Sequence, residues 1–172
     1  MTGINTRFFF DRQAVISRLD RMERRVLSKF GAFVRRRARS SVRRPRRKTL
    51  AEMSPEERAS FELAKRISKY EGRPAPKKPL ASSRPGEPFR DVTGEARKNI
   101  LFGYDPDRHS VVTGIRKTKS VGAVEALEYG GTSRITGGRD KGKLVYIEPR
   151  PVVNPARDEE LPGLPAMFRD QL

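Results

Sequence analysis

Few side chains in this sequence are of types that perform chemistry. The one histidine, His109, follows a turn-rich stretch that contains Asp105 and Asp107. Histidine catalysis or metal binding needs a second group held close to the ring. The stretch Asp-Pro-Asp-Arg before His109 is ordinary turn chemistry, so we interpret His109 as a solvated turn residue without a catalytic part.

Two other patterns resemble parts of active sites. Glu125 and Glu128 are three residues apart on a predicted short helix and can share a face, as paired acids in general acid–base catalysis do, but acids on a surface helix are usually solvated. The pairs at 130–131 and 137–138 are glycines that lack the Gly-Lys-Ser/Thr ending of a phosphate-binding loop. We interpret them as a helix stop and a hairpin bend.

The chain contains no cysteine, which excludes a disulfide framework, a thiolate metal site and a cysteine nucleophile. With the patterns above, this predicts a protein without catalytic residues, cofactor or metal. No apolar run approaches the roughly 18 residues of a membrane span, so no membrane contact is expected.

Charge is distributed very unevenly along the chain. Residues 1–48 hold 16 Lys and Arg against three acidic residues, which gives +13 of the total +17. The rest holds 22 basic and 18 acidic residues, a net of +4. A basic arm on a nearly balanced remainder is typical of proteins that bind polyanions or acidic partners.

The densest part of this arm has nine cations between Arg35 and Lys48. A nucleic acid bound here would be held without sequence preference and with strong salt dependence, because no aromatic platform for stacking lies between Arg35 and Leu50. The alternative is a solvated helix end. The candidate contacts to a polyanion or partner are Arg35, Arg36, Arg39, Arg43, Arg44, Arg46, Arg47 and Lys48.

The spacing of apolar residues over 11–41 predicts one long amphipathic helix. Apolar positions recur at steps of three and four, while most arginines fall on the opposite side. Asp11 is the expected N-cap, and Pro45 is expected to end the helix with Arg43 and Arg44 in its last turn.

A second helix is predicted over 54–70. Ser54 is a suitable N-cap, Pro55 suits the first turn, and Glu57 completes a capping box. The following stretch, 72–88, contains five prolines and is expected to be extended. It is interpreted either as a segment that reaches a neighbouring subunit or as a surface loop.

The second half changes to short elements. We expect a short helix over 93–99 with Thr93 as its cap, a hairpin over 100–115, a short helix over 121–129 and a second hairpin over 133–147. A helix is expected from Asn154, with breaks at Pro162 and Pro165. The predicted fold class is α+β, with a long basic N-terminal helix packed with a small antiparallel sheet of two hairpins and a short C-terminal helix.

Four segments follow from this division. They are a basic helical arm (1–48), an inserted helix (49–71), a proline-rich extended linker (72–92) and an α+β domain with the C-terminal helix (93–172). The last segment is expected to form one compact domain with the N-terminal helix.

The order of motifs in the second half adds a resemblance. The stretch Arg84-Pro85-Gly86-Glu87-Pro88-Phe89 leads to Thr93-Gly94, and a hairpin follows. Then come Leu127-Glu128-Tyr129-Gly130-Gly131, a segment from Pro149 to Ala156, and Leu164-Pro165-Ala166-Met167-Phe168. This ordered set resembles the neck and tail-completion proteins of tailed bacteriophages. The resemblance covers most of the chain except roughly residues 49–78.

The resemblance implies a non-enzymatic virion protein at the head–tail junction, made in the host cytoplasm and assembled as a ring, hexameric in the family. Its neighbours would be head-closure, tail-terminator or tail-tube proteins, and tail completion, head closure and an adaptor role all remain open. The candidate subunit contacts are Arg84, Pro85, Pro88, Phe89, Arg150, Pro151 and Pro155.

Three further expectations accompany the resemblance. Leu127 and Tyr129 are expected in the core, and the loop 137–142 is a candidate for ordering only on assembly. The arm is expected to meet acidic surfaces of neighbouring ring proteins rather than packaged DNA, because a conduit for DNA should not grip it. The alternative function is a sequence-nonspecific nucleic-acid-binding protein that acts through its arginine-rich arm.

Overall fold

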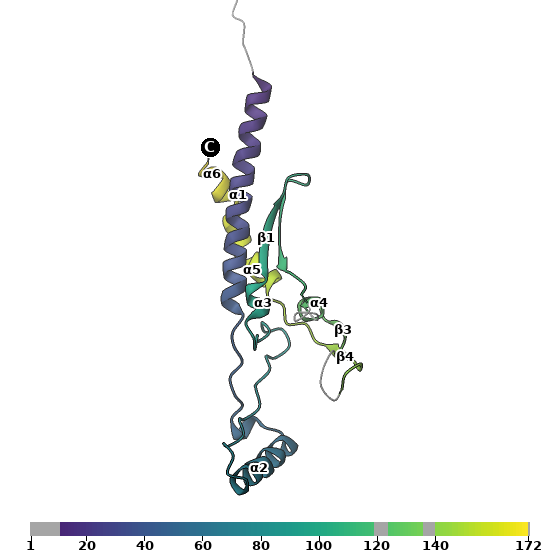
Figure 1. Cartoon of the computed structure of the whole chain (residues 1–172). Coiled ribbons are helices and arrows are strands. Elements are labelled where there is room, and N and C mark those ends of the chain that lie inside the picture. Colours follow the sequence, from purple (N-terminus) through teal and green to yellow (C-terminus); the bar gives the residue numbers. More distant parts are fainter. Residues whose placement is uncertain (1–10, 119–123, 136–139, 172) are drawn as a thin grey trace, which may run out of the picture. The chain divides into compact units, whose positions relative to one another are not determined.

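The computed structural model describes residues 11–118, 124–135 and 140–171 (Figure 1). The described residues fall into two compact units, one of residues 11–38, 100–114 and 153–171, the other of 39–99 and 115–152. The elements are α1 (Arg12–Ser41), η1 (Leu50–Glu52), α2 (Pro55–Tyr70), α3 (Glu95–Lys98), β1 (Ile100–Asp105), β2 (Ser110–Ile115), α4 (Val124–Tyr129), β3 (Gly131–Arg134), β4 (Leu144–Ile147), α5 (Val153–Glu160), η2 (Leu161–Gly163) and α6 (Leu164–Arg169).

Helix α1 is the backbone of the first unit. It begins as predicted, because the Asp11 carboxylate accepts a hydrogen bond from the Ala14 amide at 3.0 Å and caps the first turn. Its 30 residues bury one face, as the three-and-four spacing predicts. The buried residues of that face are Val26, Leu27, Phe30, Gly31, Val34 and Ala38.

The hairpin of β1 and β2 packs closely on α1. A Cβ placed on Gly31 would lie 2.6 Å from Val111 Cγ2 and 2.8 Å from Phe102 Cδ2, so only glycine permits this approach. The Arg35 Nε donates to the Ile100 carbonyl at 3.0 Å, and the Ile100 side chain is fully buried. The expected hairpin is thus confirmed, and it completes the core of this unit.

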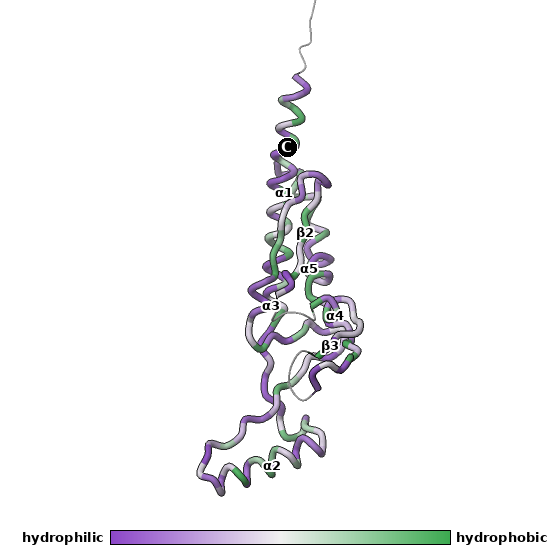
Figure 2. The backbone as a smooth tube through the Cα atoms, turned by 45° about the vertical axis from the view of Figure 1, so that its right-hand side comes forward, coloured by the Kyte–Doolittle hydropathy of each residue, from purple (hydrophilic) through white to green (hydrophobic). Residues whose placement is uncertain are grey.

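The C-terminal helices also run along α1 (Figure 1). Arg37 forms an ion pair with Glu159 of α5, and Arg25 Nη1 donates to the Gln171 side chain at 3.4 Å. Ala156 is buried in the same unit. Apolar and polar residues alternate along α1 (Figure 2), but towards its N-terminus Val15, Ile16 and Leu19 remain exposed.

In the second unit, two extended stretches lead to and from α2. The Lys48 amide donates to the Pro79 carbonyl at 2.9 Å, and the Ala81 amide donates to the Arg46 carbonyl at 2.8 Å. The second half of the proline-rich stretch is therefore hydrogen-bonded within its own chain. The predicted capping box at Ser54 and Glu57 is present, although α2 has no buried residue.

Two helix boundaries differ from the sequence prediction. Helix α1 ends at Ser41, so Arg43 and Arg44 lie outside it. Arg44 precedes a proline, which disfavours helical backbone there, and Arg43 pairs with Arg90 in a parallel bridge. Helix α3 covers only Glu95–Lys98, with Gly94 rather than Thr93 as its N-cap.

The second hairpin, β3 with β4, forms its own two-stranded antiparallel sheet, with Gly131 opposite Ile147 and Arg134 opposite Leu144. The two hairpins are separate sheets and do not form a single one. The α+β class is confirmed. Within the described ranges no helix combines the length and apolar character needed to span a bilayer.

Candidate functional site

Three motif segments that are far apart in the sequence meet in the second unit. The Gly86 amide donates to the Pro149 carbonyl at 2.9 Å, and the Arg150 Nε donates to the Ser83 carbonyl at 3.2 Å. The Arg150 amide donates to the Leu127 carbonyl at 2.6 Å. We call residues 83–86, 127–131 and 149–152 the motif junction.

Glu128 is the central side chain of the motif junction. It is only 8% exposed, and its Oε2 accepts a hydrogen bond from the Val152 amide at 2.8 Å. The interpretation of Glu128 as a solvated surface acid is therefore wrong. Its carboxylate satisfies a backbone donor that would otherwise be buried without a partner.

The end of α4 explains the two glycines that follow. Gly130 has φ of 77°, the left-handed conformation that glycine favours after a helix, as predicted for a helix stop. A Cβ on Gly130 would lie 3.1 Å from Pro149 Cδ, so the close approach of the motif junction also favours glycine. Tyr129, expected in the core, is 70% exposed, and Leu127 is half-buried.

The candidate subunit contacts are divided between surface and interior. Phe89 is 4% exposed and packs within the chain, so its side chain is occupied there. Pro88, Arg150 and Pro151 are half-buried. The exposed members of the set are Arg84, Pro85 and Pro155.

The cations of the arm fall into three groups. In the first unit, Arg35 bonds to the Ile100 carbonyl, and the exposed Arg36 guanidinium lies 4.9 Å from the centre of the Phe33 ring. These two side chains support the helix surface as well as carrying charge.

The second group holds the base of α2. Arg46 forms an ion pair with Glu52, and Lys48 Nζ lies 2.7 Å from Glu57 Oε1. Arg47 Nη1 donates to the Lys78 carbonyl at 2.5 Å. These three cations are used within the chain and are less available for a partner than the sequence suggests.

The Arg46 contact changes the acidity of its partner. Its side-chain hydrogen bond, followed by a hydrogen bond from the Thr49 backbone, lowers the pKa of Glu52 to about 2. The pKa of Glu57 is also lowered, by the hydrogen bond from Lys48 and then by the Ser54 amide. Both carboxylates are therefore charged at neutral pH and keep their cations engaged.

The third group consists of Arg39, Arg43 and Arg44, which line a pocket together with Arg97 and Lys98. Sequence analysis did not select the last two, because they follow the arm by more than fifty residues. A local signal was present in Asp91, two residues before Thr93-Gly94, where an acid can accept hydrogen bonds from the turn that follows.

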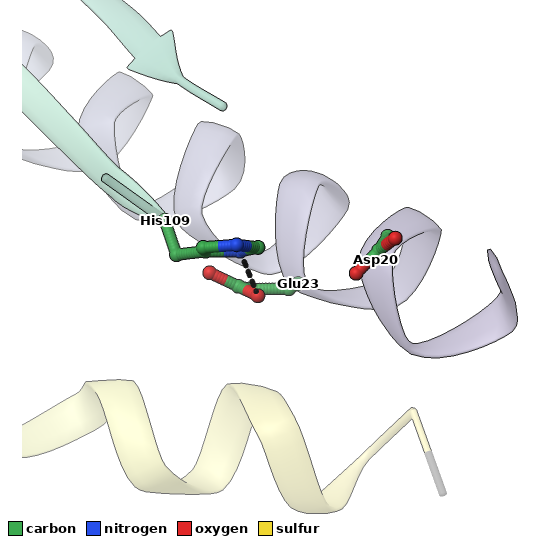
Figure 3. A group of neighbouring side chains, drawn as sticks. All are labelled: Asp20, Glu23 and His109. Atoms are coloured by element: carbon green, nitrogen blue, oxygen red, sulfur yellow. Dashed lines mark hydrogen bonds and ion pairs between the residues drawn. The ribbon is translucent and has the colours of Figure 1, made fainter. Parts of the chain in front are cut away.

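His109 has a partner that the sequence did not indicate. Its Nδ1 lies 3.0 Å from Glu23 Oε2, and Asp20 lies one turn earlier on α1 (Figure 3). One ligand-type atom from each of the three residues lies within 4.8 Å of the others. His109 and Asp20 are exposed, and we interpret the group as an ion pair that holds the hairpin turn on α1, rather than as a metal site.

His109 also has an unusual backbone for a non-glycine residue, with φ of 47°. The solvated-turn interpretation is thus incomplete, since the side chain is exposed but paired. Burial and then the charge of Glu23 raise the pKa of Tyr104 beside this group.

Comparison with known protein families, characterised proteins and solved structures finds no match to this chain. The residues of the chain itself are therefore the basis for assigning its function. The glycine loop at 137–142 lies mostly outside the described residues.

Proposed function

We propose that this protein is a non-enzymatic structural component of a tailed-phage virion, located at the head–tail junction. In this role it forms an oligomeric ring, hexameric by the family resemblance, that joins or completes the tail at the DNA-filled head. Its neighbours are head-closure, tail-terminator or tail-tube proteins. It reaches them as a protein made in the host cytoplasm.

The motif junction is the observation that carries this proposal. The Pro-Gly lead-in, the Leu-Glu-Tyr-Gly-Gly helix end and the Arg-Pro segment are the stretches on which the resemblance depends. They meet through four hydrogen bonds of 2.6 to 3.2 Å. Motifs that depend on one another in three dimensions are a stronger sign of a shared architecture than motifs that merely follow in order.

The exposed surface of the arm supports an assembly role. We propose that its cations meet acidic surfaces of neighbouring ring proteins, which would steer association electrostatically. The exposed apolar residues at the start of α1 offer area for such contacts. The second candidate function, sequence-nonspecific nucleic-acid binding, is favoured by one observation, the cation-lined pocket at 39–44.

The test is a premature stop codon in this gene of a phage that carries it. Electron microscopy of the lysate should show filled heads that accumulate apart from tails, or tails with a malformed head-proximal end. Normal infectious virions would refute the neck assignment.

Adding the purified protein back to the mutant lysate tests the contact residues. Wild-type protein should restore infectious particles, and Arg84→Glu should not, because Arg84 is an exposed member of the candidate contacts. The matched control is Arg108→Glu, an equal charge reversal at the exposed β1–β2 turn, which should restore particles. Equal activity of both variants would remove Arg84 from the interface.

A further inference from the structure

One pocket of the second unit is lined mainly by cations. It has a volume of about 360 Å³ and lies between residues 39–44, which leave α1, and residues 91–98 around α3. Its charged lining residues are Arg39, Arg43, Arg44, Asp91, Arg97 and Lys98. Five positive side chains therefore share one small pocket with a single carboxylate.

Asp91 connects the two walls of the pocket. Its amide donates to the Arg43 carbonyl at 3.0 Å, while its carboxylate oxygens accept from the amides of Gly94 and Arg97, each at 2.8 Å. Arg39 Nη2 adds a bond to the Lys98 carbonyl at 2.6 Å. Since both oxygens of the buried Asp91 already accept backbone donors, this acid organises the pocket and is not free to pair with the arginines.

Three of the guanidinium groups have no acidic partner in the part of the chain that the structure describes. The exposed side chains of Arg43, Arg44 and Arg97 form no ion pair there, whereas Lys98 lies 3.5 Å from Glu95. Like charges gathered in one pocket repel each other unless an anion joins them. The pocket therefore has unused donors that converge from two segments.

We infer that this pocket binds phosphate groups. Guanidinium forks match the oxygen geometry of phosphate and form charge-assisted hydrogen bonds with it. The volume falls near the lower end of the roughly 300–1,000 Å³ of small-molecule sites, which suits a compact, highly charged group. The phosphate can come from a free phosphate ion or from a nucleic-acid backbone.

This inference does not depend on the proposed place at the head–tail junction. It concerns the third group of arm cations alone, and Arg97 and Lys98 extend the basic surface beyond the arm. A failure of the phage experiment would leave it intact, and its own failure would leave the neck proposal intact.

The test measures binding of defined probes to the full-length protein. Inorganic phosphate and pyrophosphate are titrated by calorimetry, and a short labelled single-stranded oligonucleotide is followed by fluorescence anisotropy at several salt concentrations. The pocket variant is Arg44→Gln/Arg97→Gln. The control is Arg18→Gln/Arg21→Gln, which removes the same charge from exposed positions of α1 outside the pocket.

We expect the pocket variant to bind at least about tenfold more weakly than wild type, with a log–log salt slope for the oligonucleotide lower by about two. The control should keep most of its affinity. Pocket-dependent binding of inorganic phosphate identifies the free ion as sufficient. Pocket-dependent binding of the oligonucleotide alone identifies the backbone as the source.

An equal loss in the pocket and control variants would overturn the inference, because general charge would then explain binding. Pocket-dependent binding of oligoglutamate, with no binding of either phosphate probe, would overturn it in favour of an acidic protein partner. If circular dichroism shows the glutamine variant unfolded, Arg44→Lys/Arg97→Lys replaces it. That variant keeps the charge but loses the fork, and it should bind several-fold more weakly than the control; equal affinity would overturn the inference.

Discussion

Replacement of Gly31 by alanine tests how closely the first hairpin packs on α1. The new Cβ would lie 2.6 Å from Val111 Cγ2 and 2.8 Å from Phe102 Cδ2. These distances are far below the roughly 3.5–4.0 Å at which carbon atoms attract. The hairpin must therefore shift, or both side chains must change their conformation.

Two opposing effects set the magnitude. In an exposed helix interior, glycine to alanine stabilises by about 1 kcal/mol. Overpacking of a tight contact costs about 1–3 kcal/mol. Because two side chains must give way at Gly31, we expect overpacking to exceed the helix gain and the free energy of unfolding to fall by about 1 kcal/mol.

The assay is urea denaturation followed by circular dichroism, with a second cycle that removes the closest atom. Gly31→Ala in a Val111→Ala background should cost less than in the wild type, with a coupling of about 1 kcal/mol. Ala32→Gly is the matched control at the neighbouring helical position. It should cost about 1 kcal/mol from helix propensity, without coupling to Val111.

The result that refutes this reasoning is a rise in stability. If Gly31→Ala stabilises by about 1 kcal/mol, position 31 behaves as an exposed helix residue. The hairpin would then not approach α1 as closely as Gly31, Phe102 and Val111 indicate.

Two other predictions concern buried and paired acids. Glu128→Ala should lower the free energy of unfolding by about 2 kcal/mol and speed hydrogen exchange of the Val152 amide, because that amide loses its acceptor; Glu128→Gln, which keeps an acceptor oxygen, should cost less, and unchanged exchange in the alanine variant would contradict this role. The Glu52 carboxyl should titrate near its pKa of about 2 in a carbon-13 NMR experiment and move towards 4.5 in Arg46→Gln. Because the folded pKa is lowered, its stabilisation is present above pH 4.5 and is lost as pH falls to about 2; a wild-type midpoint near 4.5 would contradict the Arg46 contact.

The sequence by itself determined the elements whose causes are local. The capped start of α1 at Asp11, the capping box at Ser54, the two hairpins and the helix stop at Gly130 each depend on residues within a few positions of one another. Charge segregation is likewise a property of the sequence alone, and it marked the arm correctly as basic. Helix periodicity also identified the buried face of α1.

Tertiary structure decided what depends on distant partners. Glu128 accepts from an amide 24 residues away, and His109 meets Glu23 across 86 residues, so neither role has a local signal. The end of α1 was set by the pairing of Arg43 with Arg90.

The same reason separates the arm's cations. As a sequence they form one continuous run. Only the folded chain uses Arg46 and Lys48 against Glu52 and Glu57, and gathers other members with Arg97 and Lys98 around a pocket. Composition fixes how much charge a chain carries, whereas long-range packing fixes which charges are neutralised inside the chain and which remain available to bind something else.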